Sequence, residues 1–498
     1  MTAGFGWLAR SAARRPGHPA LETSGRTLSY AELAERALRL AAGLAEAGVR
    51  PGARVAVLMD AGADYVALIH AVSAAGACLV PLGPRLTEPE LRGLLADARP
   101  ALLVHDDANA ESALRCAPVA VEAEPLDVPG LESRGRGQPL DPCEPRPEDD
   151  HAVLFTSGTT GRPKGARLSN AAQHASARAS ALRLGSSPAE RWLLCLPLHH
   201  IGGLAVVLRC AIDGTTVVLH ERFDPERVAR ALSAGETTLV SLVPTMLERI
   251  FEQRPGLRAP GLRAALLGGG PIPEALIERC LSTGFPAAPT YGLTEAASQV
   301  ATLVPAELES GRGSAGPPLP GTRLRLIGDG GATAAAGEPG EIWVRGPQLM
   351  SGYLGLPDET RAALRGGWLR TGDFGRLDSA GRLHVLDRRD DLIVSGGENV
   401  YPREVEAALL AHPRVRDAAV VARSDPEWGQ VPHAVVVCDG PEPPPAELRA
   451  WLRERLAAFK LPRGFSYRAG LPRTASGKLQ RRLLREQLDA GGPPEAAP

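Results

Sequence analysis

The sequence predicts an α/β protein with a large N-terminal domain of doubly wound sheets, a β-barrel-like subdomain and a small, mobile α+β C-terminal domain. Over roughly the first 310 residues, short apolar runs alternate with segments of helical periodicity, a pattern typical of βαβ units and a mostly parallel sheet. From about residue 320 the strand-like runs are short and are separated by glycines and turns. After about residue 391 a compact series of helical and strand-like segments follows.

The N-terminal elements follow from local patterns. Residues 1–23 contain several arginines and no acid before Glu22, as transit peptides do, but we interpret them as an amphipathic first helix. Residues 30–48 have helical spacing, with Gly48 as the stop. The uncharged run 65–82 is predicted to be a buried helix leading into a strand, and not a membrane span. The run 116–150 is rich in proline and acid and is predicted to be loop. Strand candidates are 54–60, 151–158, 215–220, 237–243 and 262–269.

The domain boundaries are expected as follows. An N-terminal adenylation core covers 1–389, with an antiparallel subdomain at about 315–386. Residues 390–391 are the hinge, 392–490 the mobile C-terminal domain and 491–498 a disordered tail. In the C-terminal domain one apolar helical stripe is expected from Leu448, Trp451, Leu452, Leu456 and Phe459.

The bulk composition excludes several classes of partner. The 498-residue chain has a formal net charge of −1 and only 4% aromatic residues, so neither a global field nor a stacking surface favours nucleic acid. Its seven cysteines form no CxxC pair, which argues against a zinc framework or a disulfide scaffold and fits a reducing compartment. No apolar segment of a signal peptide follows the start. We therefore expect a cytoplasmic protein without a membrane span or a nucleic-acid partner.

Lysine is rare in this chain. Of the 56 lysine and arginine residues, only Lys164, Lys460 and Lys478 are lysines. A solvated surface charge tolerates either residue, whereas a site that needs a compact, movable ammonium does not tolerate the planar guanidinium. Lys164 and Lys478 lie in glycine-rich polar segments, "TSGTTGRPKG" and "TASGK". We therefore expect these two lysines to have chemical roles.

The segment "TSGTTGRPKG" (156–165) follows a predicted strand. Glycines allow backbone amides to approach an anion closely, and Lys164 supplies a movable cation, so the segment predicts a polyphosphate-binding loop. It is not a Walker A loop, because Gly165 stands where that motif needs Ser or Thr. The alternative is an ordinary Gly/Thr hairpin turn. The other residues expected in this loop are Thr156, Ser157, Gly158, Thr159, Thr160 and Gly161.

Two further acidic segments are candidates for the nucleotide site. In "YGLTEAASQ" (291–299) Tyr291 could stack on a base, and Glu295 could hold Mg²⁺ through oxygen; a helix start is equally compatible with it. Asp373 in "TGDFG" and Arg388 in "LDRRDD" could bind ribose hydroxyls, or the second segment could be a solvated turn.

A pair of histidines, His199 and His200, occurs in "LPLHHIGG". Adjacent residues of a strand point to opposite faces, so one metal shared by both is not expected. A histidine lining a pocket is the preferred interpretation.

Taken together with "PRTASGK", these segments resemble the adenylate-forming superfamily of acyl-CoA synthetases, peptide-synthetase adenylation domains and luciferases, over nearly the whole chain. Within it, "LPLHHIGGLAVVLRCAI", "YGLTEAASQVATL" and "VLDRRDDLIVSGGENVYPREVEAALLAHP" are most similar to the o-succinylbenzoate–CoA ligase subfamily. One departure is visible, because that subfamily usually has Phe-His-Ile-Ser-Gly where this chain has His199-His200-Ile201-Gly202-Gly203.

The resemblance implies a two-step ligase that uses ATP, Mg²⁺ and coenzyme A. A carboxylate, here 2-succinylbenzoate, is adenylated with loss of diphosphate, and the thiol of coenzyme A then displaces AMP. By motif, Thr294 would contact the α-phosphate, Glu295 would ligate Mg²⁺ and Asp390 would be the hinge residue. The adenine and ribose site would contain Gly268, Gly269, Gly270, Tyr291, Gly292, Asp373 and Arg388. The acid would contact His200, Gly269 and Ser298, and coenzyme A would contact Gly396 and Gly397.

The resemblance assigns the central catalytic role to Lys478, which would bridge the attacking carboxylate and the α-phosphate. A fixed cation there stabilises the charge that builds up in the transition state. The equivalent lysine of related ligases is acetylated, so acetylation of Lys478 is a further expectation, and a homodimer is left open. The alternatives are a ligase for another aryl or medium-chain acid and an inactive nucleotide-binding scaffold.

Overall fold

The computed structural model describes the chain apart from residues 1–5, 120–123, 139–141, 157–162, 271, 329–330, 336, 389–392, 396–397, 401, 426–427, 457, 474–478 and 490–498, and apart from the side chains of 387–388, 394, 398–399, 429 and 459. The chain divides into two compact units, residues 1–324 with 344–370 and residues 325–343 with 371–498. The predicted hinge and tail lie outside the described residues, and the predicted domain boundaries stay a prediction.

The first unit contains an eight-stranded sheet, which is parallel except at its two ends. Its central strands are short and almost fully buried, as expected for strands covered on both faces. Its strands, in spatial order, are β14 (Ser298–Thr302), β13 (Ala287–Leu293), β12 (Ala264–Leu267), β11 (Leu239–Leu242), β9 (Arg191–Leu194), β10 (Thr216–Leu219), β1 (Pro19–Glu22) and β2 (Thr27–Ser29).

A second sheet of seven strands completes the first unit. Four of its strand pairs are parallel, while β7 with β8 and β8 with β17 are antiparallel. Its strands, in spatial order, are β17 (Gly352–Tyr353), β8 (Lys164–Ser169), β7 (Asp150–Thr156), β4 (Cys78–Leu82), β3 (Arg54–Leu58), β5 (Leu102–His105) and β6 (Leu126–Asp127).

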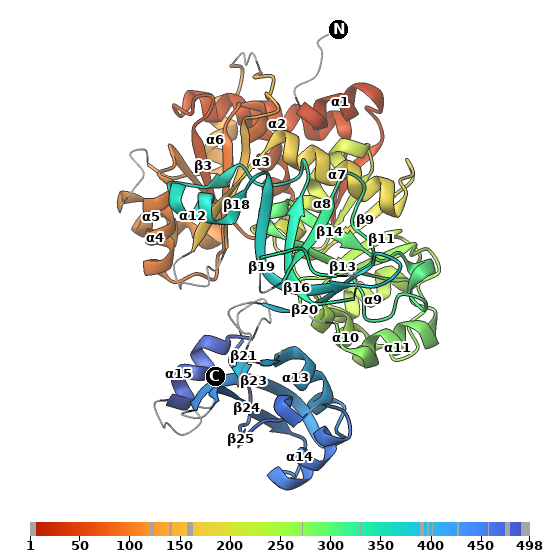
Figure 1. Cartoon of the computed structure of the whole chain (residues 1–498). Coiled ribbons are helices and arrows are strands. Elements are labelled where there is room, and N and C mark those ends of the chain that lie inside the picture. Colours follow the sequence, from red (N-terminus) through yellow and green to blue (C-terminus); the bar gives the residue numbers. More distant parts are fainter. Residues whose placement is uncertain are drawn as a thin grey trace. The chain divides into compact units, whose positions relative to one another are not determined.

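Helices cover both sheets of this unit (Figure 1). Apolar residues of α9, α10 and α11 pack on one face of the eight-stranded sheet, and those of α4 and α5 pack on one face of the other. Helix α7 contacts strands of both sheets, so it belongs to a layer between them. The helices are α1 (Gly6–Arg14), α2 (Tyr30–Glu46), α3 (Ala63–Ala74), α4 (Glu88–Ala98), α5 (Ala110–Cys116), α6 (Val128–Gly135), α7 (Asn170–Leu184), α8 (Ile201–Asp213), α9 (Pro225–Ser233), α10 (Pro244–Gln253), α11 (Glu274–Thr283) and α12 (Pro357–Ala363).

Most of the predicted elements of this unit form where the sequence indicates. Helix α2 begins with a capping box between Ser29 and Glu32, and the run 65–82 is indeed a buried helix followed by a strand. The prediction that 116–150 is loop was wrong in part, because α6 lies inside it. The Asp127 side chain accepts a hydrogen bond from the Gly130 N–H at 2.7 Å and caps this helix, and Leu131 is fully buried.

The predicted antiparallel subdomain forms a sheet of five strands. Its spatial order is β15-β16-β19-β18, with β20 paired to the second half of β19. The strands are β15 (Arg323–Ile327), β16 (Gly340–Arg345), β18 (Leu364–Arg365), β19 (Trp368–Leu377) and β20 (Leu383–Arg388).

The C-terminal part of the second unit is an α+β fold around a five-stranded sheet (Figure 1). Alternation along β23 and β24 gives the sheet two apolar faces: one packs against α13 and α14, and the other against Leu484 of α15. The predicted stripe contributes Leu448 and Leu452, both fully buried. The elements are β21 (Ile393–Ser395), β22 (Glu398–Val400), α13 (Pro402–Leu410), β23 (Val415–Asp425), β24 (Gly429–Cys438), α14 (Pro445–Arg453), β25 (Gly464–Tyr467) and α15 (Arg481–Asp489).

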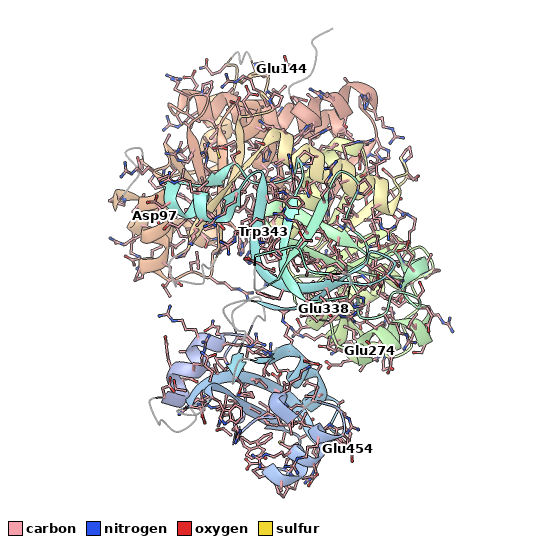
Figure 2. All side chains as sticks on the ribbon, viewed as in Figure 1. Asp97, Glu144, Glu274, Glu338, Trp343 and Glu454 are labelled. Carbon is pink, nitrogen blue, oxygen red and sulfur yellow. The ribbon has the colours of Figure 1, made fainter. Side chains whose placement is uncertain are left out.

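The surface is charged, with exposed acidic residues such as Glu274 and Glu454 (Figure 2). Among the residues that the structure describes, no helix has the length and apolarity needed to cross a bilayer. All seven cysteines are free thiols. In the described part of the chain, short 3-10 turns lie at Asp107–Asn109, Ala117–Val119, Thr294–Ala296, Pro305–Glu307 and Ala458–Lys460.

Candidate active site

The two ends of the predicted phosphate loop meet in a β-hairpin. Strands β7 and β8 are antiparallel, and Thr156 lies directly opposite Lys164. The Thr156 hydroxyl donates a hydrogen bond to the Lys164 carbonyl oxygen at 3.4 Å. The residues between them that were expected to bind phosphate (Ser157, Gly158, Thr159, Thr160 and Gly161) lie outside the described residues. The hairpin therefore fixes the base of the loop and the residue that carries the ammonium.

Glu295 lies in a tight turn between two antiparallel strands. A 3-10 turn at Thr294–Ala296 joins β13 to β14, so the helix start that the sequence also allowed is limited to this one short turn. Ala297 and Ser298 have φ angles of 48° and 101°, a region that residues with a Cβ seldom occupy. Such backbone strain persists where the surrounding structure fixes it, and it is frequent at functional sites.

Tyr353 connects Lys164 with Glu295. The Lys164 Nζ lies 5.5 Å from the centroid of the Tyr353 ring, and the Tyr353 hydroxyl donates to Glu295 Oε1 at 3.0 Å. The backbone supports this arrangement, because the Met350 N–H donates to the Glu295 carbonyl oxygen at 2.8 Å. Tyr353 was not predicted from the sequence, because nothing in "SGYLG" distinguishes it from a strand residue.

The residues predicted for the adenine site lie along the edge of the eight-stranded sheet that is formed by the carboxyl ends of its parallel strands. Gly268, Gly269 and Gly270 follow β12, and Tyr291 lies on the neighbouring parallel strand β13, an edge where α/β proteins commonly bind ligands. Tyr291 is 8% exposed. Gly292 is required for packing here, because a Cβ would lie 2.0 Å from the carbonyl oxygen of Ser298.

The two histidines do not have the geometry that the sequence suggested. The strand β9 ends at Leu194, and His199 and His200 lie in the turn before α8. The two rings therefore do not point to opposite faces of a strand, and their centroids lie only 4.4 Å apart. Desolvation lowers the pKa of His199 to about 3, so this ring is neutral at pH 7. The expectation of opposite faces was wrong because β9 ends five residues before His199, so the two histidines are not strand residues.

Arg209 is a buried cation that was also not predicted from the sequence. It lies on α8, is 3% exposed, and donates from Nη2 to the Ser298 hydroxyl at 3.1 Å. Its guanidinium carbon is 5.4 Å from the Trp192 ring, and burial lowers its pKa to about 10. Among the described residues its Nε has no hydrogen-bond partner. The sequence does contain an indication that Arg209 is unusual, because it is the only charged residue between His200 and Asp213.

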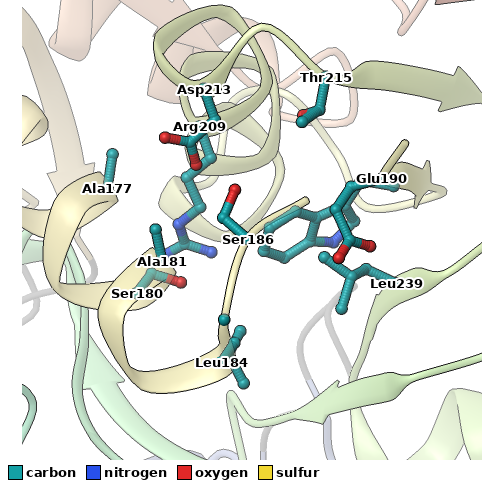
Figure 3. Close-up of a pocket in the computed structure, with 12 residues that line it drawn as sticks. Ala177, Ser180, Ala181, Leu184, Ser186, Glu190, Arg209, Asp213, Thr215 and Leu239 are labelled. Atoms are coloured by element: carbon teal, nitrogen blue, oxygen red, sulfur yellow. The ribbon is translucent and has the colours of Figure 1, made fainter. Parts of the chain in front are cut away.

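A cavity lies beside Arg209. Figure 3 shows the Arg209 side chain extending from α8 toward Ala181 and Ser180 of α7. The accessible volume of this cavity is about 10 Å³, which is room for about one water molecule. An acyl group therefore does not fit in the cavity as it stands, and the Arg209 Nε is itself buried, so a ligand would reach it only after nearby side chains move.

In the second unit, Asp373 and Arg388 are direct neighbours. They are cross-strand partners of β19 and β20, as a shared role on ribose requires. Asp373 is 6% exposed, and its N–H donates to the Thr371 hydroxyl at 3.0 Å. The Arg388 side chain is not among the described groups. The remaining predicted residues, Asp390, Gly396, Gly397 and Lys478, lie outside the described residues.

The site suits a magnesium ion that arrives with a nucleotide. The described residues contain no group of three or more His, Cys, Asp or Glu side chains that could hold a metal. Mg²⁺ is usually held by one or two carboxylates, with phosphate oxygens and water as its other ligands. A single oriented carboxylate at Glu295, linked through Tyr353 to the ammonium of Lys164 at the base of the predicted phosphate loop, fits this pattern.

Comparison with known proteins defines the class. The AMP-binding enzyme family matches residues 8–354, and the AMP-binding enzyme C-terminal domain matches residues 404–478. The chain therefore belongs to the AMP-binding enzyme family, which confirms the adenylate-forming superfamily predicted from the motifs.

Relatives within this family narrow the resemblance. A 2-succinylbenzoate–CoA ligase of Bacillus velezensis is 40% identical over 96% of this chain and 97% of its own length. A ligase of the same name from Geobacillus kaustophilus is 42% identical over 98% and 99%.

Solved structures agree with the sequence relatives. The o-succinylbenzoate CoA synthetase of Bacillus subtilis in complex with the acyl-adenylate intermediate OSB-AMP has a TM-score of 0.90 and is 38% identical, over 97% of this chain and 99% of that protein. The same enzyme with ATP and magnesium has a TM-score of 0.89 at 38% identity, over 96% and 99%. The predicted fold class is confirmed by this match.

Proposed function

We propose that this protein is an ATP-dependent acid–CoA ligase that converts 2-succinylbenzoate, ATP and coenzyme A to 2-succinylbenzoyl-CoA, AMP and diphosphate. The observation that carries the assignment of the acid is the buried guanidinium of Arg209 beside Ser298. Two relatives that match almost the whole chain are both named 2-succinylbenzoate–CoA ligase, and this similarity supports the proposal independently.

The chemistry of the acid explains why a buried cation is useful. 2-Succinylbenzoate has two carboxylates, and only one of them is activated. The other must be desolvated beside the site, which is costly unless it is paired and hydrogen-bonded. Arg209 Nε is buried and has no partner among the described residues. We infer that side chains around the one-water cavity move when the acid binds, and that Nε then donates a charge-assisted hydrogen bond to this second carboxylate. Ser298, already predicted to contact the acid, accepts a hydrogen bond from Nη2 of the same guanidinium.

The first half-reaction brings two anions together. The substrate carboxylate attacks the α-phosphorus, the bond to the β-phosphate oxygen breaks, and diphosphate leaves. Lys164 would hold the terminal phosphates, Thr294 would contact the α-phosphate, and Lys478 would bridge the carboxylate and the α-phosphate as negative charge accumulates. Magnesium, when bound, would neutralise part of the phosphate charge next to Glu295.

The second half-reaction releases AMP. The thiol of coenzyme A attacks the acyl carbonyl carbon, loses its proton, and the bond between the acyl carbon and the AMP oxygen breaks. Asp373 and Arg388, opposite each other in β19 and β20, would hold the ribose during both steps. Gly396 and Gly397 would line the path of the thiol, and Asp390 would act as the hinge.

The test measures both half-reactions with a panel of acids. Isotope exchange between diphosphate and ATP reports adenylation, and coenzyme A-dependent AMP release reports the complete reaction. We expect both with 2-succinylbenzoate, and much less turnover with benzoate or octanoate. Turnover with benzoate or octanoate instead would favour the ligase for another acid. If no acid supports either isotope exchange or AMP release, the protein would instead be a nucleotide-binding scaffold.

Three further properties are part of the proposal. Free thiols at all seven cysteines support a reducing compartment, and we place the protein in the cytoplasm. Acetylation of Lys478 would remove the charge on which adenylation depends. A homodimer stays a prediction that a sedimentation measurement would check.

A further inference from the structure

The contact made by the hydroxyl of Tyr353 suggests a role that none of the motifs assigns. This hydroxyl donates to Glu295 Oε1 at 3.0 Å, and its ring lies under the Lys164 ammonium at 5.5 Å. One side chain thus touches both the carboxylate expected to ligate Mg²⁺ and the cation expected to hold phosphate.

The position of Tyr353 is fixed by its own backbone. Strand β17 pairs with β8, which places Tyr353 opposite Ala166, two residues beyond Lys164. The Tyr353 N–H donates to the Thr360 hydroxyl at 2.9 Å, and that hydroxyl donates to the Leu356 carbonyl oxygen at 2.7 Å. The aromatic ring is therefore carried by a short, hydrogen-bonded segment and not by a long loop.

The two contacts of this tyrosine differ in chemistry. A hydrogen bond to one oxygen of a carboxylate fixes the rotation of the carboxylate, as partners of metal ligands commonly do. A ring beneath an ammonium attracts it through the ring quadrupole and leaves its N–H donors available for phosphate. The hydroxyl thus acts on the carboxylate, and the ring acts on the lysine.

We propose that Tyr353 is a positioning residue that orients Glu295 for Mg²⁺ and Lys164 for the phosphates of the same nucleotide. This inference rests on the proposed roles of Lys164 and Glu295. It predicts that the hydroxyl governs the magnesium dependence of ATP binding, whereas the ring governs ATP binding without metal.

The experiment measures ATP binding by isothermal titration calorimetry over a series of free Mg²⁺ concentrations, and without Mg²⁺. In Tyr353→Phe the Mg²⁺ concentration for half-maximal enhancement should rise about tenfold or more, while metal-free ATP binding should stay within about twofold of wild type. In Tyr353→Leu metal-free binding should also weaken, by about two- to fivefold. Thermal unfolding checks that each variant is folded.

Two controls separate positioning from a general structural effect. Tyr467→Phe removes another tyrosine hydroxyl that donates to a backbone oxygen, that of Pro443, and should bind MgATP as wild type does. In a Glu295→Gln background, Tyr353→Phe should cause little further change in magnesium dependence, because the two residues act through one contact.

The possible results are distinguishable. Unchanged magnesium dependence in Tyr353→Phe, or an equal loss of binding with and without Mg²⁺, would overturn the positioning role while leaving the proposed function intact. If wild-type protein shows no magnesium-dependent ATP binding at all, the proposed function fails, and this inference fails with it.

Discussion

Replacing Arg209 with leucine would test how the protein selects its acid. Arg209 is 3% exposed and donates to Ser298, and its Nε, which has no hydrogen-bond partner among the described residues, would supply one charge-assisted hydrogen bond to a second carboxylate. Hydrogen bonds to charged groups contribute about 1.5–3 kcal/mol. This range corresponds to a loss of roughly 10- to 150-fold in kcat/KM for 2-succinylbenzoate.

The same substitution should affect a monocarboxylate little. Benzoate has no second carboxylate to pair with Arg209, so its low kcat/KM should change by less than about threefold, or improve. Because the substitution also removes the hydrogen bond to Ser298 and a cation near Asp213, thermal unfolding must show that the variant is folded. The matched control is Arg178→Leu, on the neighbouring helix α7, where a half-exposed arginine lies 3.5 Å from Asp213.

The assay is steady-state AMP release with both acids, together with thermal unfolding. Selective loss of the dicarboxylate reaction is the expected outcome. An equal loss with both acids would mean that Arg209 supports the fold of the site and does not contact substrate. Unchanged turnover of 2-succinylbenzoate would place its second carboxylate elsewhere and refute the reasoning.

Three further predictions follow from other parts of the chain. Lys478→Ala should reduce diphosphate–ATP exchange by about 10²–10³, whereas thioester formation from supplied acyl-adenylate should survive; equal losses in both assays would contradict its role. Burial lowers the pKa of His70 to about 3 and of His151 to about 4. Both histidines stay neutral in the folded protein, whereas in the unfolded chain they bind protons below about pH 6.5. Protonation therefore favours the unfolded chain, and the free energy of unfolding falls as the pH drops below this value. Denaturant titrations should show a loss of about 2–3 kcal/mol between pH 7.5 and 5.5, and a flat profile would refute this. Gly292→Ala should destabilise the fold by about 1–3 kcal/mol, because its Cβ would lie 2.0 Å from a facing carbonyl oxygen, whereas Gly270→Ala, with no atom within 4 Å of its Cβ, should unfold at the wild-type temperature.

The core strands were predictable because burial on both faces selects uninterrupted apolar runs, and the segment 54–60 contains β3 for this reason. Helix α6 was missed because proline and acid dominate the composition of its region. Its stability comes from one cap at Asp127 and from Leu131, which is fully buried. A composition average over 35 residues hides both features.

The site was predictable where one local segment carries several chemical groups. The hairpin around Lys164 and the turn around Glu295 are such segments. Tyr353 could not be found in this way, because its partners lie 189 and 58 residues earlier in the chain. Arg209 could have been found, since a charge that follows eight uncharged residues of an apolar helix must have a buried partner or a ligand.

The pairing of β17 with β8 has a consequence for how the protein is made. Gly352 and Tyr353 cover a strand edge at Ala166 and Arg167, so that edge of the seven-stranded sheet has no β17 neighbour until the ribosome has synthesised more than two thirds of the chain. Unpaired strand edges promote aggregation. Nascent chains that stop before residue 352 should therefore depend on chaperones more than chains that extend past it.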